Sequence, residues 1–144
     1  YNNANLSIPL APSDIAPRFF EFLERNRKEW GLARNVFVDC ADQATITELK
    51  KYKRTNPNVY TINDSYKKVT IIDRIHLQLG WLNYENGPVY YEVVDTCINH
   101  IMEHEVYSWK EDKYEPEDAN DHTINASQYA WIPYRKHIYN YKGE

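Results

Sequence analysis

The chain of 144 residues has the length of one domain, and its 42% hydrophobic content is enough for a packed core. Its net charge of −4 excludes a protein that wraps DNA by overall charge alone. No apolar run approaches the roughly 20 residues that span a bilayer, and no signal peptide is visible. Two cysteines without a CxxC pattern indicate reduced thiols in a cytosolic protein. Because the sequence begins at Tyr1, we expect a fragment or a processed product.

The first half of the chain predicts two helices and two strands. Apolar residues recur at near-helical spacing over 14–30, and Gly31 predicts the end of that helix. Ser13 and Asp14 are the expected cap, and Pro17 is expected in the first turn. The elements predicted next are a strand over 36–38, a helix over 43–53, a turn at 56–58 and a strand over 59–62.

The second half predicts three more helices and two short extended pieces. In chain order these are a helix over 69–82, a strand over 89–93, a helix over 95–105, an extended piece over 107–110 and a helix over 120–132. Alternation of strands and helices favours an α/β layer fold. The apolar run Val36–Val38 predicts a strand buried on both faces, inside a sheet that the helices near 14–30 and 120–132 flank.

Two stretches carry residues that suit a divalent cation: VDCADQATITEL (38–49) and NDHTINASQYA (120–130). Asp39 stands at the end of the buried strand. His122 and Asn125 are three positions apart at the start of a helix, so they share one face. We therefore expect the polar atoms of these three side chains to converge. The alternative for Asp39 is a cap of the helix that follows.

Together with KKVTIIDRIHLQL (67–79) and EHEVYSWKED (103–112), these stretches resemble the C-terminal nuclease domain of large terminase subunits, the DNA-packaging motors of tailed bacteriophages. The resemblance implies a ribonuclease H-like fold, a mixed sheet flanked by helices. The family's first strands, which carry its first catalytic Asp, are not found before residue 13, because so few residues cannot form them. Residues 1–144 are therefore expected to be a single domain, the C-terminal portion of a terminase-type nuclease domain.

The resemblance implies a metal-dependent endonuclease that cuts concatemeric double-stranded DNA with Mg²⁺ or Mn²⁺. It assigns catalysis to Asp39, His122 and Asn125. It assigns metal binding to Asp39 and Asn125, with Asp121 able to compensate from a nearby position. Asn125 stands where the family has its third acidic ligand. The alternative is therefore a catalytically degraded, nuclease-like module that grips DNA or docks to the portal.

The resemblance also implies partners: double-stranded DNA, the portal protein, the small terminase subunit and the ATPase domain of the same subunit. The chain contains no GxxxxGK[ST] phosphate loop, so ATP belongs to a separate domain. Lys67 and Lys68 are candidate DNA-binding residues, with an exposed turn as the other interpretation. We expect no membrane contact, and a location in the host cytoplasm, docked on the procapsid during packaging.

A rival motif lies between the two stretches. His100-x-x-Glu103-His104 fits the inverted zincin pattern, in which the two histidines bind zinc and the glutamate acts as a base. A zinc metallohydrolase is therefore a further alternative. A third ligand would have to come from the acidic loop over 111–118, and the sequence predicts no second helix there.

Overall fold

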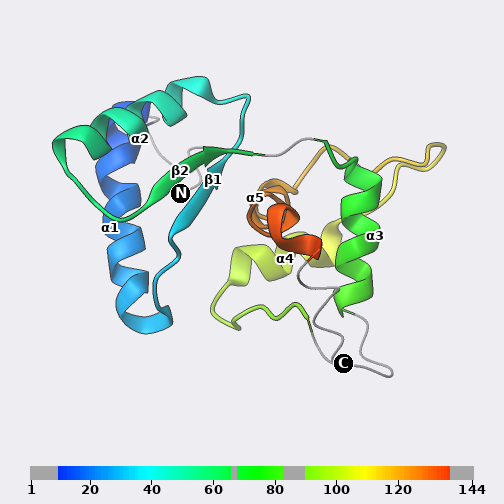
Figure 1. Ribbon diagram of the computed structural model, residues 1–144. Helices are drawn as coiled ribbons and strands as arrows, with labels where there is room; N and C mark the ends of the chain where they lie inside the picture. Colours follow the sequence, from blue (N-terminus) through cyan, green and yellow to red (C-terminus); the bar gives the residue numbers. More distant parts are fainter. Residues whose placement is uncertain (1–9, 66–67, 83–89, 137–144) are drawn as a thin grey trace. The chain divides into compact units, whose positions relative to one another are not determined.

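The computed structural model describes residues 10–65, 68–82 and 90–136 (Figure 1). The chain divides into two compact units, residues 1–65 (unit 1) and residues 66–144 (unit 2). Strands and helices alternate in unit 1, whereas the described elements of unit 2 are helices. The predicted mixed α/β class is therefore confirmed. That the whole chain forms a single domain stays a prediction.

Helix α1 (Pro12–Trp30) opens unit 1. Its N-cap is Ala11, whose backbone N–H donates to the carboxylate of Asp14 at 3.2 Å. The helix begins earlier than predicted because proline suits the first helical position, where a missing N–H costs little. Ser13 and Asp14 consequently lie inside the helix, and Pro17 lies in its interior rather than in its first turn.

Gly31 ends α1 as predicted, with a φ of 90° that favours glycine. Strand β1 (Asn35–Val38), helix α2 (Gln43–Thr55) and strand β2 (Thr61–Asp64) follow, and the two strands pair in parallel. Strand β2 lies two residues later than predicted. The hydrogen bonds with β1 set the residues at which β2 begins and ends, and the apolar run alone could not predict them.

One core holds unit 1 together. Val36 and Ile62 are register partners, so their side chains point to the same face of the sheet. They pack with residues of both helices and with the residue before β2: Ala16, Phe20, Leu49 and Tyr60. The ring of Phe20 stacks on that of Tyr52, with centroids 5.4 Å apart. Helices α1 and α2 thus cover one face, while Phe37 on the other face is only half-buried.

The sheet of unit 1 is smaller than predicted. In the described part of the chain it has two strands, and a larger mixed sheet with β1 in its interior stays a prediction. A two-stranded sheet is marginal by itself, and the covering helices supply the burial that stabilises it. The predicted packing of the 120–132 helix against this sheet involves both units and stays a prediction.

Helices α3 (Ile71–Leu82), α4 (Ile98–Val106) and α5 (His122–Trp131) form the described framework of unit 2. A short 3-10 helix, η2 (Ile132–Tyr134), continues α5. The three α-helices confirm the helices predicted over 69–82, 95–105 and 120–132 to within a few residues.

Two tryptophans and Ile132 form the buried core of unit 2. Trp81 and Trp131 meet edge to face, with ring centroids 4.4 Å apart. Tyr90 and Tyr91 pack against this core. The strand predicted over 89–93 is wrong for its described part, which contains no strand, and its first residue lies outside the described residues.

A short hairpin connects α4 to α5. Trp109 bridges antiparallel to Pro116, and the N–H of Lys110 donates to the carbonyl oxygen of Glu115 at 3.0 Å. The ring of Trp109 stacks on that of Tyr114, with centroids 5.0 Å apart. The extended piece predicted over 107–110 is therefore the first arm of this hairpin.

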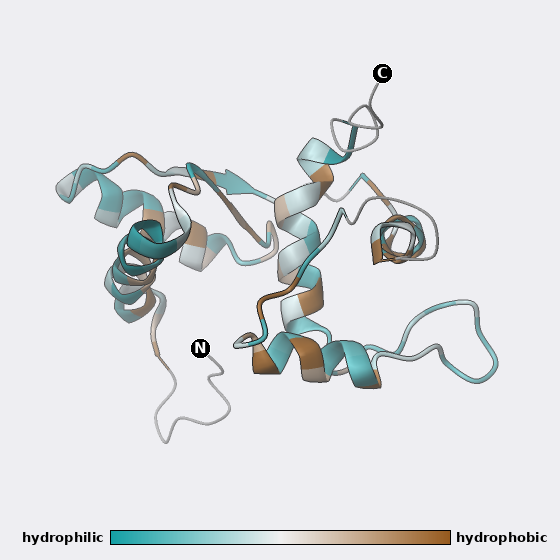
Figure 2. Ribbon diagram, turned by 90° about the horizontal axis from the view of Figure 1, so that it is seen from below, coloured by the Kyte–Doolittle hydropathy of each residue, from teal (hydrophilic) through white to brown (hydrophobic). Residues whose placement is uncertain are grey.

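Hydrophobic and hydrophilic segments alternate along the helices (Figure 2). Within the described ranges, no helix combines the length and the apolar character needed to cross a membrane.

Candidate functional site

Asp39, the first predicted metal ligand, directly follows strand β1 and is half-buried. Its Oδ1 accepts a hydrogen bond from the N–H of Ala41 at 2.9 Å, which turns the chain after the strand. The helix cap is Asp42, whose Oδ1 accepts from the N–H of Thr45 at 3.0 Å. Since Asp42 caps α2, the capping alternative for Asp39 is not needed to explain that helix.

A second carboxylate, Asp64, ends strand β2 opposite Val38. Ser65 closes this edge of the sheet: its N–H donates to the carbonyl oxygen of Val38 at 2.7 Å, and its Oγ accepts from the N–H of Cys40 at 3.0 Å. Asp39 thus directly follows β1, and Asp64 is the last residue of β2. Both lie at the carboxyl ends of two paired parallel strands, which is where open α/β sheets bind ligands. Sequence reasoning missed Asp64 because it placed the strand two residues too early.

Three predicted site residues meet at the start of α5. Buried Asp121 accepts, at Oδ2, a hydrogen bond from Nδ2 of Asn125 at 2.8 Å. Nδ1 of His122 lies 3.8 Å from Oδ1 of Asp121, although the His122 side chain is 89% exposed. Asn120, with a φ of 52°, leads into this turn in a left-handed conformation that asparagine tolerates. The structure therefore brings Asp121, His122 and Asn125 together within unit 2.

The cap of α5 comes from another helix. Asp121 occupies the N-cap position without a side-chain capping bond. Instead, Oε2 of Glu103 in α4 accepts from the N–H groups of Thr123 and Ile124 at 2.7 and 3.1 Å, and from the hydroxyl of Thr123 at 2.6 Å. First-turn N–H groups have no partner inside their own helix. Because Glu103 satisfies two of them, the carboxylate of Asp121 is left to bind Asn125.

The pKa of Glu103 lies below its ordinary value. Burial alone raises this pKa, but the hydrogen bonds from the Thr123 side chain and from the backbone of Ile124 and Thr123 together outweigh it. Glu103 is therefore ionised at neutral pH. Its negative charge lies at the N-terminus of α5, where the helix dipole favours an anion. Sequence reasoning gave Glu103 only a place in the zinc motif, because no local pattern reveals a cap from another helix.

His100 is held between two hydroxyl groups. Its Nδ1 lies 2.9 Å from Oγ1 of Thr123, and its Nε2 lies 2.9 Å from the hydroxyl of Tyr91. Because the Thr123 hydroxyl donates to Glu103, its oxygen accepts from Nδ1–H, and Nε2 accepts from Tyr91. Burial and the neighbouring His104 lower the pKa of His100, against a smaller opposite effect of Glu103. His100 is therefore neutral at neutral pH.

His104 continues this network to α3. Its Nδ1 donates to the carbonyl oxygen of His100 at 2.9 Å, and its Nε2 accepts from Nε2 of Gln78 at 2.9 Å. Buried Gln128 of α5 donates to Oε1 of Gln78 at 3.2 Å. Every ring nitrogen of the two histidines thus has a partner. Zinc at the HxxEH motif would have to displace one of these bonds at each ring and compete with the bonds of Glu103 to α5.

The described residues contain no group of three or more His, Cys, Asp or Glu side chains placed to hold a metal ion. Asp39 belongs to unit 1 and the other predicted ligands to unit 2, so their convergence stays a prediction. Of the candidate DNA-binding residues, Lys68 is exposed just before α3, and Lys67 lies outside the described residues.

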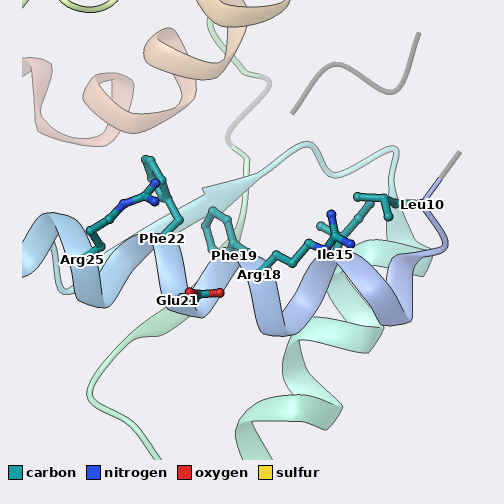
Figure 3. A pocket seen from close by; sticks show the side chains of 7 residues that line it. All are labelled: Leu10, Ile15, Arg18, Phe19, Glu21, Phe22 and Arg25. Carbon is teal, nitrogen blue, oxygen red and sulfur yellow. The ribbon is translucent and has the colours of Figure 1, made fainter. Parts of the chain in front are cut away.

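A groove of about 640 Å³ lies along α1 in unit 1 (Figure 3). Apolar and charged side chains line it: Leu10, Ile15, Arg18, Phe19, Glu21, Phe22 and Arg25. The guanidinium of Arg25 lies 5.8 Å from the centroid of the Phe22 ring, within reach of a cation–π interaction. None of the predicted site residues lines this groove.

Comparison of the chain with protein-family models, with curated proteins and with solved structures found no match.

Proposed function

We propose that this chain is the C-terminal portion of the nuclease domain of a phage terminase large subunit, which cuts concatemeric double-stranded DNA during packaging. The observation that carries the proposal is the hydrogen-bonded pair of Asp121 and Asn125 in the first turn of α5, with His122 exposed beside it. These are the positions where the resemblance expects the last metal ligand and its neighbouring histidine. The pair supports a ligand role because Glu103, not Asp121, caps this helix.

A ribonuclease H-like fold for the complete nuclease domain is part of this proposal. Unit 1 supports it with two parallel strands joined by a helix, and with Asp39 just after the carboxyl end of β1. In the complete nuclease domain, further strands outside this chain would enlarge this sheet. They would also supply the first catalytic Asp that the resemblance implies.

In this proposal the cation would be Mg²⁺ or Mn²⁺, because the proposed ligands would offer oxygen atoms: the carboxylates of Asp39 and Asp121 and the side-chain carbonyl of Asn125. Nδ2 of Asn125 donates to Asp121, so the carbonyl of the same amide is the atom left for a cation. When bound, the two ions would activate a water and stabilise the leaving oxygen. The exposed imidazole of His122 would orient the water or the scissile phosphate.

Lys67 and Lys68 would contact the phosphates of double-stranded DNA. Since the chain carries a net charge of −4, most of the affinity for DNA would come from its partners. We propose that these are the portal protein, the small terminase subunit and the ATPase domain of the same subunit, which would hold ATP. The setting is the host cytoplasm, with the enzyme docked on the procapsid.

A degraded nuclease-like module is the second candidate function, and Asn125 favours it. A neutral amide can ligate a hard cation, but it lacks the negative charge that attracts one. In that case the domain would grip DNA or dock to the portal without cutting.

Cleavage of plasmid DNA by the full-length protein with Mn²⁺ tests the proposal. Asp39→Ala should abolish cleavage while the circular dichroism spectrum stays unchanged. Asp42→Ala is the matched control. It removes a carboxylate from the same loop, but that carboxylate caps α2 and is not a proposed metal ligand. Unchanged cleavage by Asp39→Ala would eliminate Asp39 as a ligand. A wild-type protein that shifts DNA in a gel but never cuts it would select the degraded module.

Asn125→Asp tests the proposed ligands of unit 2. The new carboxylate would replace an amide that now donates to Asp121 at 2.8 Å, so two like charges would repel each other. We expect a lower melting temperature without metal and a larger rise on adding Mn²⁺ than in the wild type. Asn99→Asp, at an exposed position on α4, is the control. Equal Mn²⁺-induced rises in the two variants would contradict this assignment.

A further inference from the structure

Helix α4 turns its polar side inward and its apolar side outward. His100, Glu103 and His104 form the hydrogen-bond network with α3 and α5 described above. On the opposite side, Ile98, Met102 and Val106 are 57%, 56% and 58% exposed. These three residues, here called the α4 stripe, are four positions apart and therefore form one continuous line along the helix.

The α4 stripe differs from scattered surface hydrophobics. A surface helix normally buries its apolar face against the core. Helix α4 instead has no fully buried residue. The segment before it adds two more exposed apolar side chains, Val93 and Val94. An apolar line that the described fold leaves open is typical of an interaction site.

The charge around the α4 stripe is acidic. Residues 90–109 contain no Lys or Arg. The exposed carboxylates of this segment are Glu92, Asp95 and Glu105, and none of them forms an ion pair with another described residue. On the helix, Glu105 borders the stripe on one side and Asn99 borders it on the other.

We propose that the α4 stripe binds an amphipathic helix of another protein that carries Lys or Arg beside its own apolar face. Apolar residues at helical spacing would pack on Ile98, Met102 and Val106, and the basic residues would meet Glu105 and Asp95. A second copy of this chain fits less well, because an antiparallel pair of stripes would bring the acidic border with Glu105 against the same border of the other copy. This inference does not depend on the nuclease proposal.

A designed peptide of about 18 residues, built from strong helix formers so that it is helical in water, tests the inference. It carries leucines at helical spacing with lysines on both borders. One control peptide has glutamates in place of the lysines, and another has the leucines scrambled. Fluorescence anisotropy with the full chain measures each dissociation constant. We expect the lysine peptide to bind and both controls to bind at least about tenfold more weakly.

Variants of the chain identify the surface. Met102→Asp should weaken binding of the lysine peptide about tenfold or more, and Met102→Gln should weaken it less. Glu105→Lys should weaken the lysine peptide and strengthen the glutamate peptide. Val59→Asp is the matched control, because Val59 is 49% exposed and lies in unit 1. Circular dichroism checks that each variant folds.

The inference is overturned if the glutamate peptide binds as tightly as the lysine peptide, or if Val59→Asp weakens binding as much as Met102→Asp. It is also overturned if sedimentation shows that the chain dimerises and that Met102→Asp abolishes the dimer. In that case the occupant of the α4 stripe is a second copy.

Discussion

Replacing Glu103 by Gln should destabilise unit 2, because this side chain caps α5 from α4. Oε2 of Glu103 accepts three hydrogen bonds, two from the N–H groups of Thr123 and Ile124 and one from the Thr123 hydroxyl. A glutamine keeps the shape and one carbonyl acceptor, but it removes the charge that strengthens these bonds and interacts with the helix dipole.

The expected loss for Glu103→Gln follows from these bonds. Hydrogen bonds to a charged group are worth about 1.5–3 kcal/mol, and a neutral acceptor retains part of this. Glu103 is partly exposed, so we take about 1–1.5 kcal/mol for the loss in free energy of unfolding. With a urea slope of about 1.5 kcal/mol per molar, the midpoint should fall by about 0.7–1 M. Tryptophan fluorescence follows the transition, because Trp81 and Trp131 form the core of unit 2.

The effect of Glu103→Gln should depend on pH. The pKa of Glu103 is lowered in the folded chain, so the ionised side chain stabilises the fold above its ordinary pKa of 4.5. The stabilisation by the ionised Glu103 is lost as pH falls from about 4.5 through the pKa of the folded chain. The difference in free energy of unfolding between wild type and Glu103→Gln should therefore shrink over this range. Glu105→Gln is the control, since Glu105 is exposed on the same helix. Equal midpoints for wild type and Glu103→Gln at neutral pH would refute the capping role.

Asp42→Ala should lower the free energy of unfolding by about 1 kcal/mol in a urea titration, because it removes the cap of α2. Lys51→Ala, which removes the surface ion pair with Glu48, should lower it by less than about 0.5 kcal/mol. Wild-type stability should fall as pH decreases below about 6.5, because the lowered pKa of His100 makes the unfolded chain bind its proton first. His100→Asn should flatten that slope, and an unchanged slope would point to another group. Metal analysis should find zinc well below stoichiometric amounts; about one zinc per chain, lost in His100→Ala and His104→Ala, would support the zinc hydrolase instead.

Much of the candidate site was readable from the sequence because it depends on local geometry. The position of Asp39 follows from a short apolar run that ends in a carboxylate. The shared face of His122 and Asn125 follows from helical spacing. Contact between Asp121 and Asn125 was within reach of the same argument, since residues four apart on a helix are neighbours. What the spacing could not give is that this carboxylate is buried and that another residue caps the helix.

The sequence by itself determined the helices and the first strand, because hydrophobic periodicity and a glycine at positive φ act within a few residues. Tertiary structure decided the register of β2, since hydrogen bonds to β1 fix it. It also decided the role of the HxxEH motif. A charged or polar side chain needs hydrogen-bond partners when it is buried. The partners lie on α5 for Glu103, on the segment before α4 for His100 and on α3 for His104. The polar face of α4 is therefore its inner face, which no periodicity in the sequence distinguishes from an outer one.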